Sequence, residues 1–166
     1  HGTDRAIIAG IMGMKPDDER LPQSLAIAEE NHFPYTIRTV KIPKCHPNTA
    51  LVRLWAADGD SAEIEGASVG GGNILITKLN GMESAFTGQY NTLIIPHNDT
   101  YGVIAGVTQA LAAFRINIGN FRLTRQEKGH QAIMTLEVDG DVSRELLTLL
   151  RALPNVLHAV YLHANE

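Results

Sequence analysis

One stretch, residues 91–120, limits what this chain can fold into more than any other. It opens with an apolar run at 93–95, which predicts a buried strand. A polar turn and Gly102 follow, and apolar side chains then recur with helical spacing. These side chains are Val103, Val107, Leu111 and Phe114. A strand that leads through a polar turn into an amphipathic helix predicts an α/β fold, with the first helical N–H groups facing the turn.

The remainder of the second half continues this alternation. Residues 120–126 and 132–138 alternate as strands around a turn at 127–129, and 143–153 predict a short leucine-rich helix. Residues 156–162 predict the last strand. The order strand–helix–strand–strand–helix–strand predicts a ferredoxin-like sheet with both helices on one face.

The first half predicts a second α/β part that meets the other near Gly88. Helices are expected at 5–12, with Thr3 or Asp4 as the N-cap, and at 21–30. Strands are expected in five places, with hairpin turns at 58–59 and 80–81. The five strands are 35–42, 50–56, 61–65, 74–79 and 82–86. We interpret the glycines at 70–72 as a bulge or subunit contact rather than a phosphate loop, because no Gly-Lys-Ser/Thr follows.

Composition narrows the class of protein. The chain has 166 residues, 44% of them hydrophobic and 19% charged, with a formal net charge of −4, which is typical of a soluble globular protein. No basic cluster indicates nucleic acid or an anionic membrane as a partner. No apolar run reaches the roughly 20 residues that span a bilayer. We therefore expect a cytoplasmic protein.

The chain has a single cysteine, Cys45, next to His46. One cysteine excludes an internal disulfide, and this chain alone cannot supply a four-cysteine iron–sulfur site. No second such pair lies nearby in the sequence, so we interpret this segment as a solvated loop and predict no metal site in this chain.

The stretch at 94–125, IIPHNDTYGVIAGVTQALAAFRINIGNFRLTR, together with RALPNVLHAVYL at 151–162, resembles an ACT domain. This small regulatory module binds amino acids. Typical members carry Asp/Asn-x-Pro-Gly in the turn, whereas this chain has Asp99-Thr100-Tyr101-Gly102. The resemblance implies an ACT regulatory domain at 89–166.

Four motifs occur in order along the rest of the chain: HGTD at 1–4, PDDER at 16–20, HPNT at 46–49 and GASVGGGNI at 66–74. Together they resemble the beta part of iron–sulfur-dependent L-serine dehydratase, a lyase that converts L-serine to pyruvate and ammonia. The resemblance implies that residues 1–88 are the C-terminal portion of an allosteric substrate-binding domain. It also implies an alpha partner that carries the cysteines of a [4Fe–4S] cluster.

The same resemblance suggests catalytic contributors. His1, Thr3 and Asp4 match the HGTD motif, which in the family lies near the alpha–beta junction. Histidine is a residue type that can act as a general base, so His1 could have this role. The alternative is that the motif only provides a polar helix cap and interface group. The family's beta part also begins with a Ser-Ser-His-Thr segment that does not occur here. We therefore expect this chain alone to lack activity.

Matching the ACT pattern residue by residue implies an effector site for L-serine or a similar small amino acid. His97, Asp99 and Asn117 fall at positions that hold serine in related modules. Backbone N–H groups at Tyr101, Gly102 and Val103 are expected to take the carboxylate, and Asp99 the ammonium. We expect Asn117 to reach the same turn, and a homo-oligomer to form through the ACT domains because the edges of their sheets are open.

Two alternatives remain open at the level of sequence. The chain could be the regulatory end of D-3-phosphoglycerate dehydrogenase, which shares both domain types and would require a nicotinamide-binding domain upstream. It could also be a free-standing amino-acid-binding module without catalysis. HGTD and HPNT fit the dehydrogenase poorly.

The cysteine count generates a first prediction. The purified chain should contain no stoichiometric iron or sulfide and should form no pyruvate from L-serine, because cluster ligation requires about three or four cysteines. Iron and acid-labile sulfide analysis, with a pyruvate assay, measures this. Iron and sulfide in stoichiometric amounts would show the prediction to be wrong.

Overall fold

The computed structural model describes residues 2–59, 61–125 and 127–164, and the chain divides into two compact units, 1–43 and 44–166. The first unit holds helix α1 (Thr3–Ile11), the short 3₁₀ helix η1 (Leu21–Gln23) and helix α2 (Ser24–Glu30). None of the helices in the described part of the chain is long and apolar enough to cross a membrane.

A small core joins the helices of the first unit. Ile8 and Ala9 of α1 and Ala28 of α2 are buried. The buried Ser24 hydroxyl donates to the carbonyl of Arg5 at 2.8 Å. This bond satisfies a polar side chain that would otherwise be costly to bury.

Two predictions for the first unit are wrong. Gly2, not Thr3 or Asp4, is the N-cap of α1, in a left-handed conformation (φ 77°) and without a side-chain cap. Thr3 and Asp4 instead lie in the first helical turn. Residues 35–42 form no strand, and Ile37 and Val40 are exposed. Alternating sequence makes a strand only when a neighbouring strand pairs with it.

The second unit contains two four-stranded antiparallel sheets. The first sheet joins β1 (Thr49–Trp55), β2 (Ser61–Gly70), β3 (Asn73–Leu79) and β4 (Met82–Phe86) in sequence order. Both predicted hairpins are confirmed by this pairing.

Two turns of the first sheet depend on backbone that favours glycine or asparagine. Asn80 (φ 50°) and Gly81 (φ 77°) connect β3 to β4, which is the geometry of a two-residue type I′ turn. The glycines at 70–72, all with positive φ, connect β2 to β3, and the register shifts between Ser68 and Gly70. The predicted bulge is therefore present.

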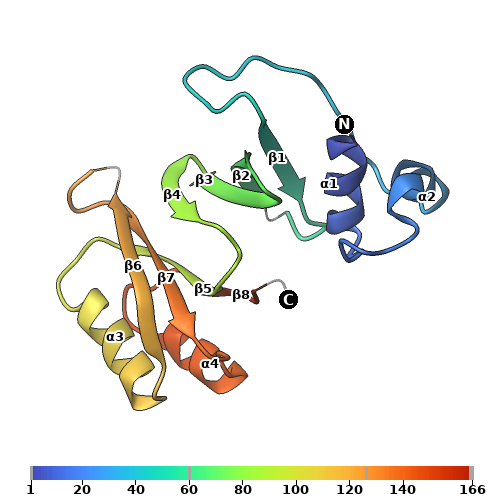
Figure 1. Cartoon of the computed structure of the whole chain (residues 1–166). Coiled ribbons are helices and arrows are strands. Elements are labelled where there is room, and N and C mark those ends of the chain that lie inside the picture. The colour runs from blue at the N-terminus through green and yellow to red at the C-terminus, as the bar shows by residue number, and fades with distance from the viewer. Residues whose placement is uncertain (1, 60, 126, 165–166) are drawn as a thin grey trace. The chain divides into compact units, whose positions relative to one another are not determined.

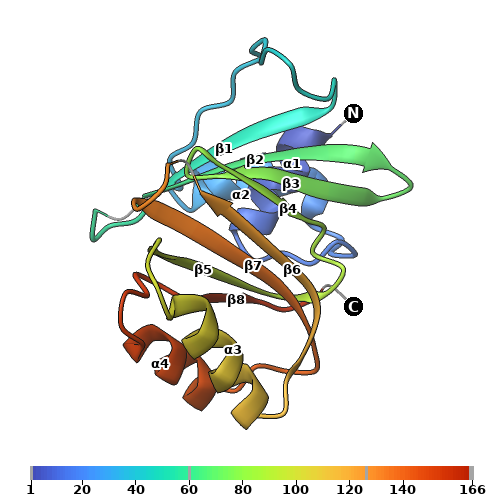
Figure 2. The same cartoon turned by 90° about the vertical axis from the view of Figure 1, so that its left-hand side faces the viewer.

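The second sheet has the predicted ferredoxin-like order. Its strands are β5 (Asn91–Asn98), β6 (Asn117–Arg125), β7 (Gln131–Asp139) and β8 (Val160–Leu162), arranged β6-β7-β5-β8. Helices α3 (Val103–Ala113) and α4 (Arg144–Ala152) both cover one face (Figures 1 and 2). Ser143 caps α4 through a 3.1 Å bond from the Leu146 N–H to its hydroxyl. The last strand is shorter than predicted, and a single bridge from His97 to Val156 precedes it.

Both faces of this sheet are covered within the second unit. On the helix side, Leu93, Ile95, Met134 and Leu136 pack in one cluster with apolar residues of both helices. On the other side, Ile94 and Ile133 pack with Met82 and Phe86 of β4. The Ser84 and Thr135 hydroxyls lie 3.4 Å apart across this second contact.

The predicted domain boundary near Gly88 stays a prediction. Both sheets belong to one compact unit, 44–166, so the division into compact units does not fall between them.

Helix α4 provides a matched test of the helix-side core. Leu150 is 0% exposed and Leu149 is 41% exposed. We expect Leu150→Ala to lower the free energy of unfolding by about 2–5 kcal/mol, because it leaves a cavity. Leu149→Ala should change it by about 0.5 kcal/mol or less. Urea denaturation measures both, and equal effects would contradict this assignment of the core.

Candidate functional site

The turn from β5 into α3 ends in an open helix N-terminus. Gly102 is the N-cap, with φ 85° and ψ −14°, and no side chain caps the first N–H groups. The left-handed φ favours glycine at this position. Tyr101, which stands where typical ACT domains carry proline, is 103% exposed. Its side chain therefore projects into solvent.

His97 is a buried residue rather than a solvated turn residue. It is 2% exposed, and its Nδ1 lies 3.1 Å from the carbonyl oxygen of Ile95. The segment after α4 closes over the same end of β5, where Asn98 donates its N–H to the Asn155 carbonyl at 2.9 Å. His97 thus lines the inner wall of the turn.

Asp99 holds the turn against the end of the β6–β7 hairpin. Its Oδ2 accepts from Arg125 Nη1 at 3.1 Å and from the Gly129 N–H at 3.1 Å. The Asp99 N–H donates to the carbonyl of His130 at 2.7 Å. The Gly129 N–H, followed by Arg125, lowers the pKa of the Asp99 carboxyl, and His97 adds to this effect.

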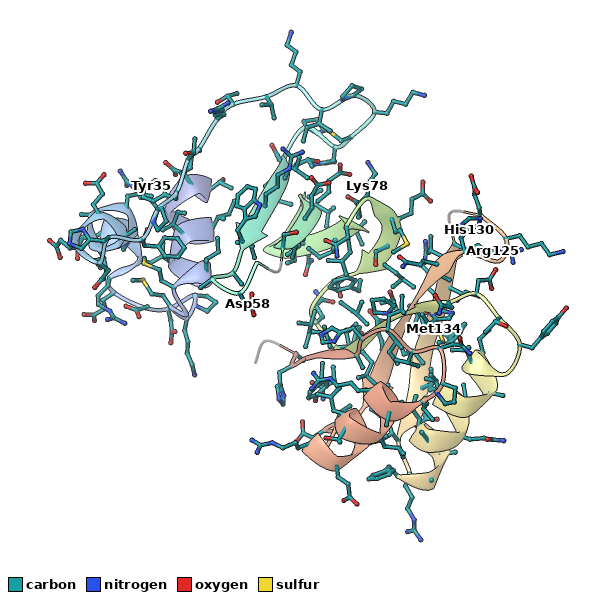
Figure 3. All side chains as sticks on the ribbon, turned by 180° about the vertical axis from the view of Figure 1, so that it is seen from behind. Tyr35, Asp58, Lys78, Arg125, His130 and Met134 are labelled. Carbon is teal, nitrogen blue, oxygen red and sulfur yellow. The ribbon has the colours of Figure 1, made fainter. Side chains whose placement is uncertain are left out.

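Arg125 and Gly129 belong to the site although sequence reasoning did not include them. Figure 3 shows Arg125 and His130 at the hairpin end of β6 and β7. The pairs Asn98–Gln131 and Arg125–Ala132 place this hairpin end beside the end of β5. The predicted hairpin combined with an assumed strand order would have located both residues.

The expectation that Asn117 reaches the same turn is wrong within one chain. Asn117 pairs with Asp139, whereas Asn98 pairs with Gln131 at the other end of β7. Strand β7 also lies between β5 and β6. Asn117 is therefore separated from Arg125 by roughly 26 Å of strand, at about 3.3 Å per residue. Its Nδ2 instead donates to Asp139 Oδ2 at 2.7 Å.

The predicted catalytic contributors lie in the first unit. His1 is outside the described residues. Thr3 and Asp4 are exposed in the first turn of α1, and the negative charge of Asp4 contributes to the raised pKa of Tyr35, after burial and Glu29. Their catalytic role stays a prediction.

Other candidate sites are weaker. Within the described ranges, no group of three or more His, Cys, Asp or Glu residues is arranged to hold a metal ion. Cys45 is half-buried in the loop before β1. A hollow of about 880 Å³ lies between the C-terminal end of α3 and α4, and none of the predicted site residues lines it. Its lining is Phe114, Arg144, Glu145, Thr148, Leu149 and Ala152.

The β5–α3 turn therefore presents two complementary features to a small ligand. The uncapped N–H groups of α3 favour an anion, and the ionised Asp99 carboxylate favours a cation. An α-amino-acid zwitterion carries both groups on one carbon atom, Cα. The ferredoxin-like sheet with both helices on one face places this domain in the class of small βαββαβ modules.

Comparison with known proteins agrees with this class. The sequence model of the ACT domain family matches residues 92–155, which run from β5 past the end of α4. The "Probable L-serine dehydratase, beta chain" of Bacillus subtilis (strain 168) is 40% identical over 157 residues, which is 95% of this chain and 71% of the relative. The "L-serine dehydratase, beta chain" of Peptoniphilus asaccharolyticus is 28% identical over 97% of this chain and 73% of its own length.

This chain belongs to the family of L-serine dehydratase beta chains, and it contains an ACT domain. A D-3-phosphoglycerate dehydrogenase of Bacillus subtilis (strain 168) is 33% identical over 82 residues. That similarity spans 49% of this chain and 16% of the dehydrogenase. The similarity to the dehydrogenase therefore extends over a part of the chain, whereas the beta chains match almost all of it.

The Asp99 contacts predict a pH-dependent stability. The pKa of the Asp99 carboxyl is lower in the folded protein than its ordinary value of 3.8. The ionised carboxylate therefore stabilises the fold above that ordinary value, and this stabilisation is lost as the pH falls through the lower folded pKa. Asp99→Asn should therefore lower the urea midpoint relative to wild type at about pH 6, and the difference should shrink as the pH falls below the carboxyl's ordinary pKa. Asp17→Asn, at an exposed aspartate between α1 and η1, is the control. A difference that persists at low pH would exclude this cause.

Proposed function

We propose that this chain is the beta part of an iron–sulfur L-serine dehydratase, which converts L-serine to pyruvate and ammonia. The observation that carries the proposal is the 40% identity to a probable L-serine dehydratase beta chain over 95% of this chain. A beta chain needs an alpha partner, to which we attribute the [4Fe–4S] cluster. When bound there, the cluster supplies a Lewis acid for the serine hydroxyl.

In this proposal residues 1–88 are the C-terminal portion of the substrate-binding domain, and 89–166 are the regulatory ACT domain. The HGTD residues would then lie near the alpha chain. Thr3 and Asp4 are exposed, as contributors to a site shared with another chain must be.

The regulatory ligand that we propose is L-serine, bound at the β5–α3 turn. The first N–H groups of α3 receive its carboxylate at the uncapped end of the helix. The Asp99 carboxylate receives its ammonium through a charge-assisted hydrogen bond. Buried His97 forms the wall behind the ligand.

Asn117 can serve the same ligand only from a second copy of the chain. Strand β6 is an edge strand, and Phe121 lies midway between Asn117 and Arg125 along it. Two β6 edges that pair antiparallel about Phe121 would set Asn117 of one copy opposite Arg125 of the other. Each turn would then gain an amide from its neighbour.

The exposed side chains along this edge support such a pairing. Phe121 and Leu123 of β6 are 39% and 37% exposed, and Ile104 of α3 is 41% exposed. Unpaired edges with apolar side chains are usually covered, and two-fold contacts are the commonest symmetry of homo-oligomers. We therefore propose a dimer of ACT domains with two effector sites at its interface.

Calorimetry tests the effector site. Wild type should bind L-serine at millimolar concentration, and Asp99→Ala and Asn117→Ala should each weaken binding by about tenfold or more, the loss expected for a hydrogen bond to a charged group. Asn120→Ala is the control, because Asn120 lies on the same strand and also donates to a carboxylate, Glu137 Oε2 at 3.2 Å. No heat with wild type, or unchanged binding in both variants, would refute the site.

The catalytic assignment has its own test. The full-length protein, purified together with its alpha partner, should contain iron and sulfide and should form pyruvate from L-serine. An assembled complex that holds the cluster but leaves L-serine unchanged would refute the assignment.

A further inference from the structure

We infer that Arg125 is an autoinhibitory latch on the ammonium subsite, so that its guanidinium competes with the effector for the Asp99 carboxylate. The inference rests on the proposed effector site and concerns how that site is kept closed. It assigns a regulatory role to a residue that the ACT pattern did not mark.

The geometry of the turn carries the inference. Arg125 Nη1 and the Gly129 N–H both lie 3.1 Å from the same oxygen, Asp99 Oδ2. The Asp99 side chain is only 20% exposed, whereas that of Arg125 is 53% exposed. The carboxylate is thus largely covered, and the group that pairs with it extends toward solvent.

An exposed partner is one that a ligand can replace. The guanidinium can leave Asp99 for water, because the Arg125 side chain is already 53% exposed. An ion pair with one solvent-exposed partner contributes little to stability, so the latch is weak enough for a small ligand to open. A guanidinium carries a positive charge, as an ammonium does, and the two groups therefore compete for the same carboxylate.

The backbone can hold the turn in place while the side chains exchange. The Asp99 N–H bond to the His130 carbonyl, at 2.7 Å, does not involve either side chain. The Gly129 N–H can keep its bond to Asp99 when Arg125 leaves. Effector binding thus displaces only the Arg125 side chain. The guanidinium that it frees lies at the hairpin end of β6, so the change on binding is located there.

Calorimetry with L-serine on the whole chain tests the latch. Arg125→Gln removes the competing charge, and we expect its dissociation constant to be about two- to fivefold lower than that of wild type, the size that an exposed ion pair provides. The matched control is Arg122→Gln on the same strand, since Arg122 is exposed and lies on the opposite face by strand alternation. Its affinity should equal that of wild type, and sedimentation should show that all three share one oligomeric state.

The outcomes separate the latch from the effector site. Wild type and Arg125→Gln binding equally well, or Arg125→Gln binding more weakly, overturns the latch and leaves the site. If wild type, Arg125→Gln and Arg122→Gln all give no heat with L-serine, both the effector site and the latch are overturned. Without ligand, NMR titration of the Asp99 carboxyl should give a higher midpoint in Arg125→Gln than in wild type. An unchanged midpoint overturns the latch whatever the calorimetry shows.

Discussion

The antiparallel pairing of β5 with β7 determines where every residue of the candidate site lies. Eight consecutive pairs, from Asn91–Val138 to Asn98–Gln131, fix the register. This register places the end of β5, the start of α3 and the β6–β7 turn together at one end of the strands. A slip by one residue would exchange the two faces of a strand, and it would move Leu93 and Ile95 out of the helix-side core.

The sequence predicted this fold well wherever local chemistry decides the structure. Asn80-Gly81 favours a tight hairpin turn, and the spacing of Val107, Leu111 and Phe114 favours a helix with one buried face over a strand. Prediction from the sequence failed where the structure depends on a neighbouring strand or on the backbone conformation of a flanking residue. Residues 35–42 alternate like a strand, but no strand among the described residues pairs with them, and Gly2 replaces the expected side-chain cap through its backbone alone.

The candidate site shows the same division. His97, Asp99 and Gly102 are close in sequence, so a single turn brings them together. Asn117 was expected beside them because it begins the next strand along the chain. The predicted ferredoxin-like order inserts β7 between the two strands, so the expectation for Asn117 conflicted with the predicted fold. The long-range contact of Arg125 with Asp99 cannot be read from local patterns.

Strand β4 has a further consequence for how the chain can be divided. Met82 and Phe86 cover Ile94 and Ile133 on the face of the sheet opposite the helices. A fragment that starts after Gly88 would keep all four strands of the ACT domain and yet expose this apolar face to water. Such a fragment would be prone to self-association through its back face. A shorter piece of the protein that is meant to behave as a monomer should therefore retain the hairpin of β3 and β4.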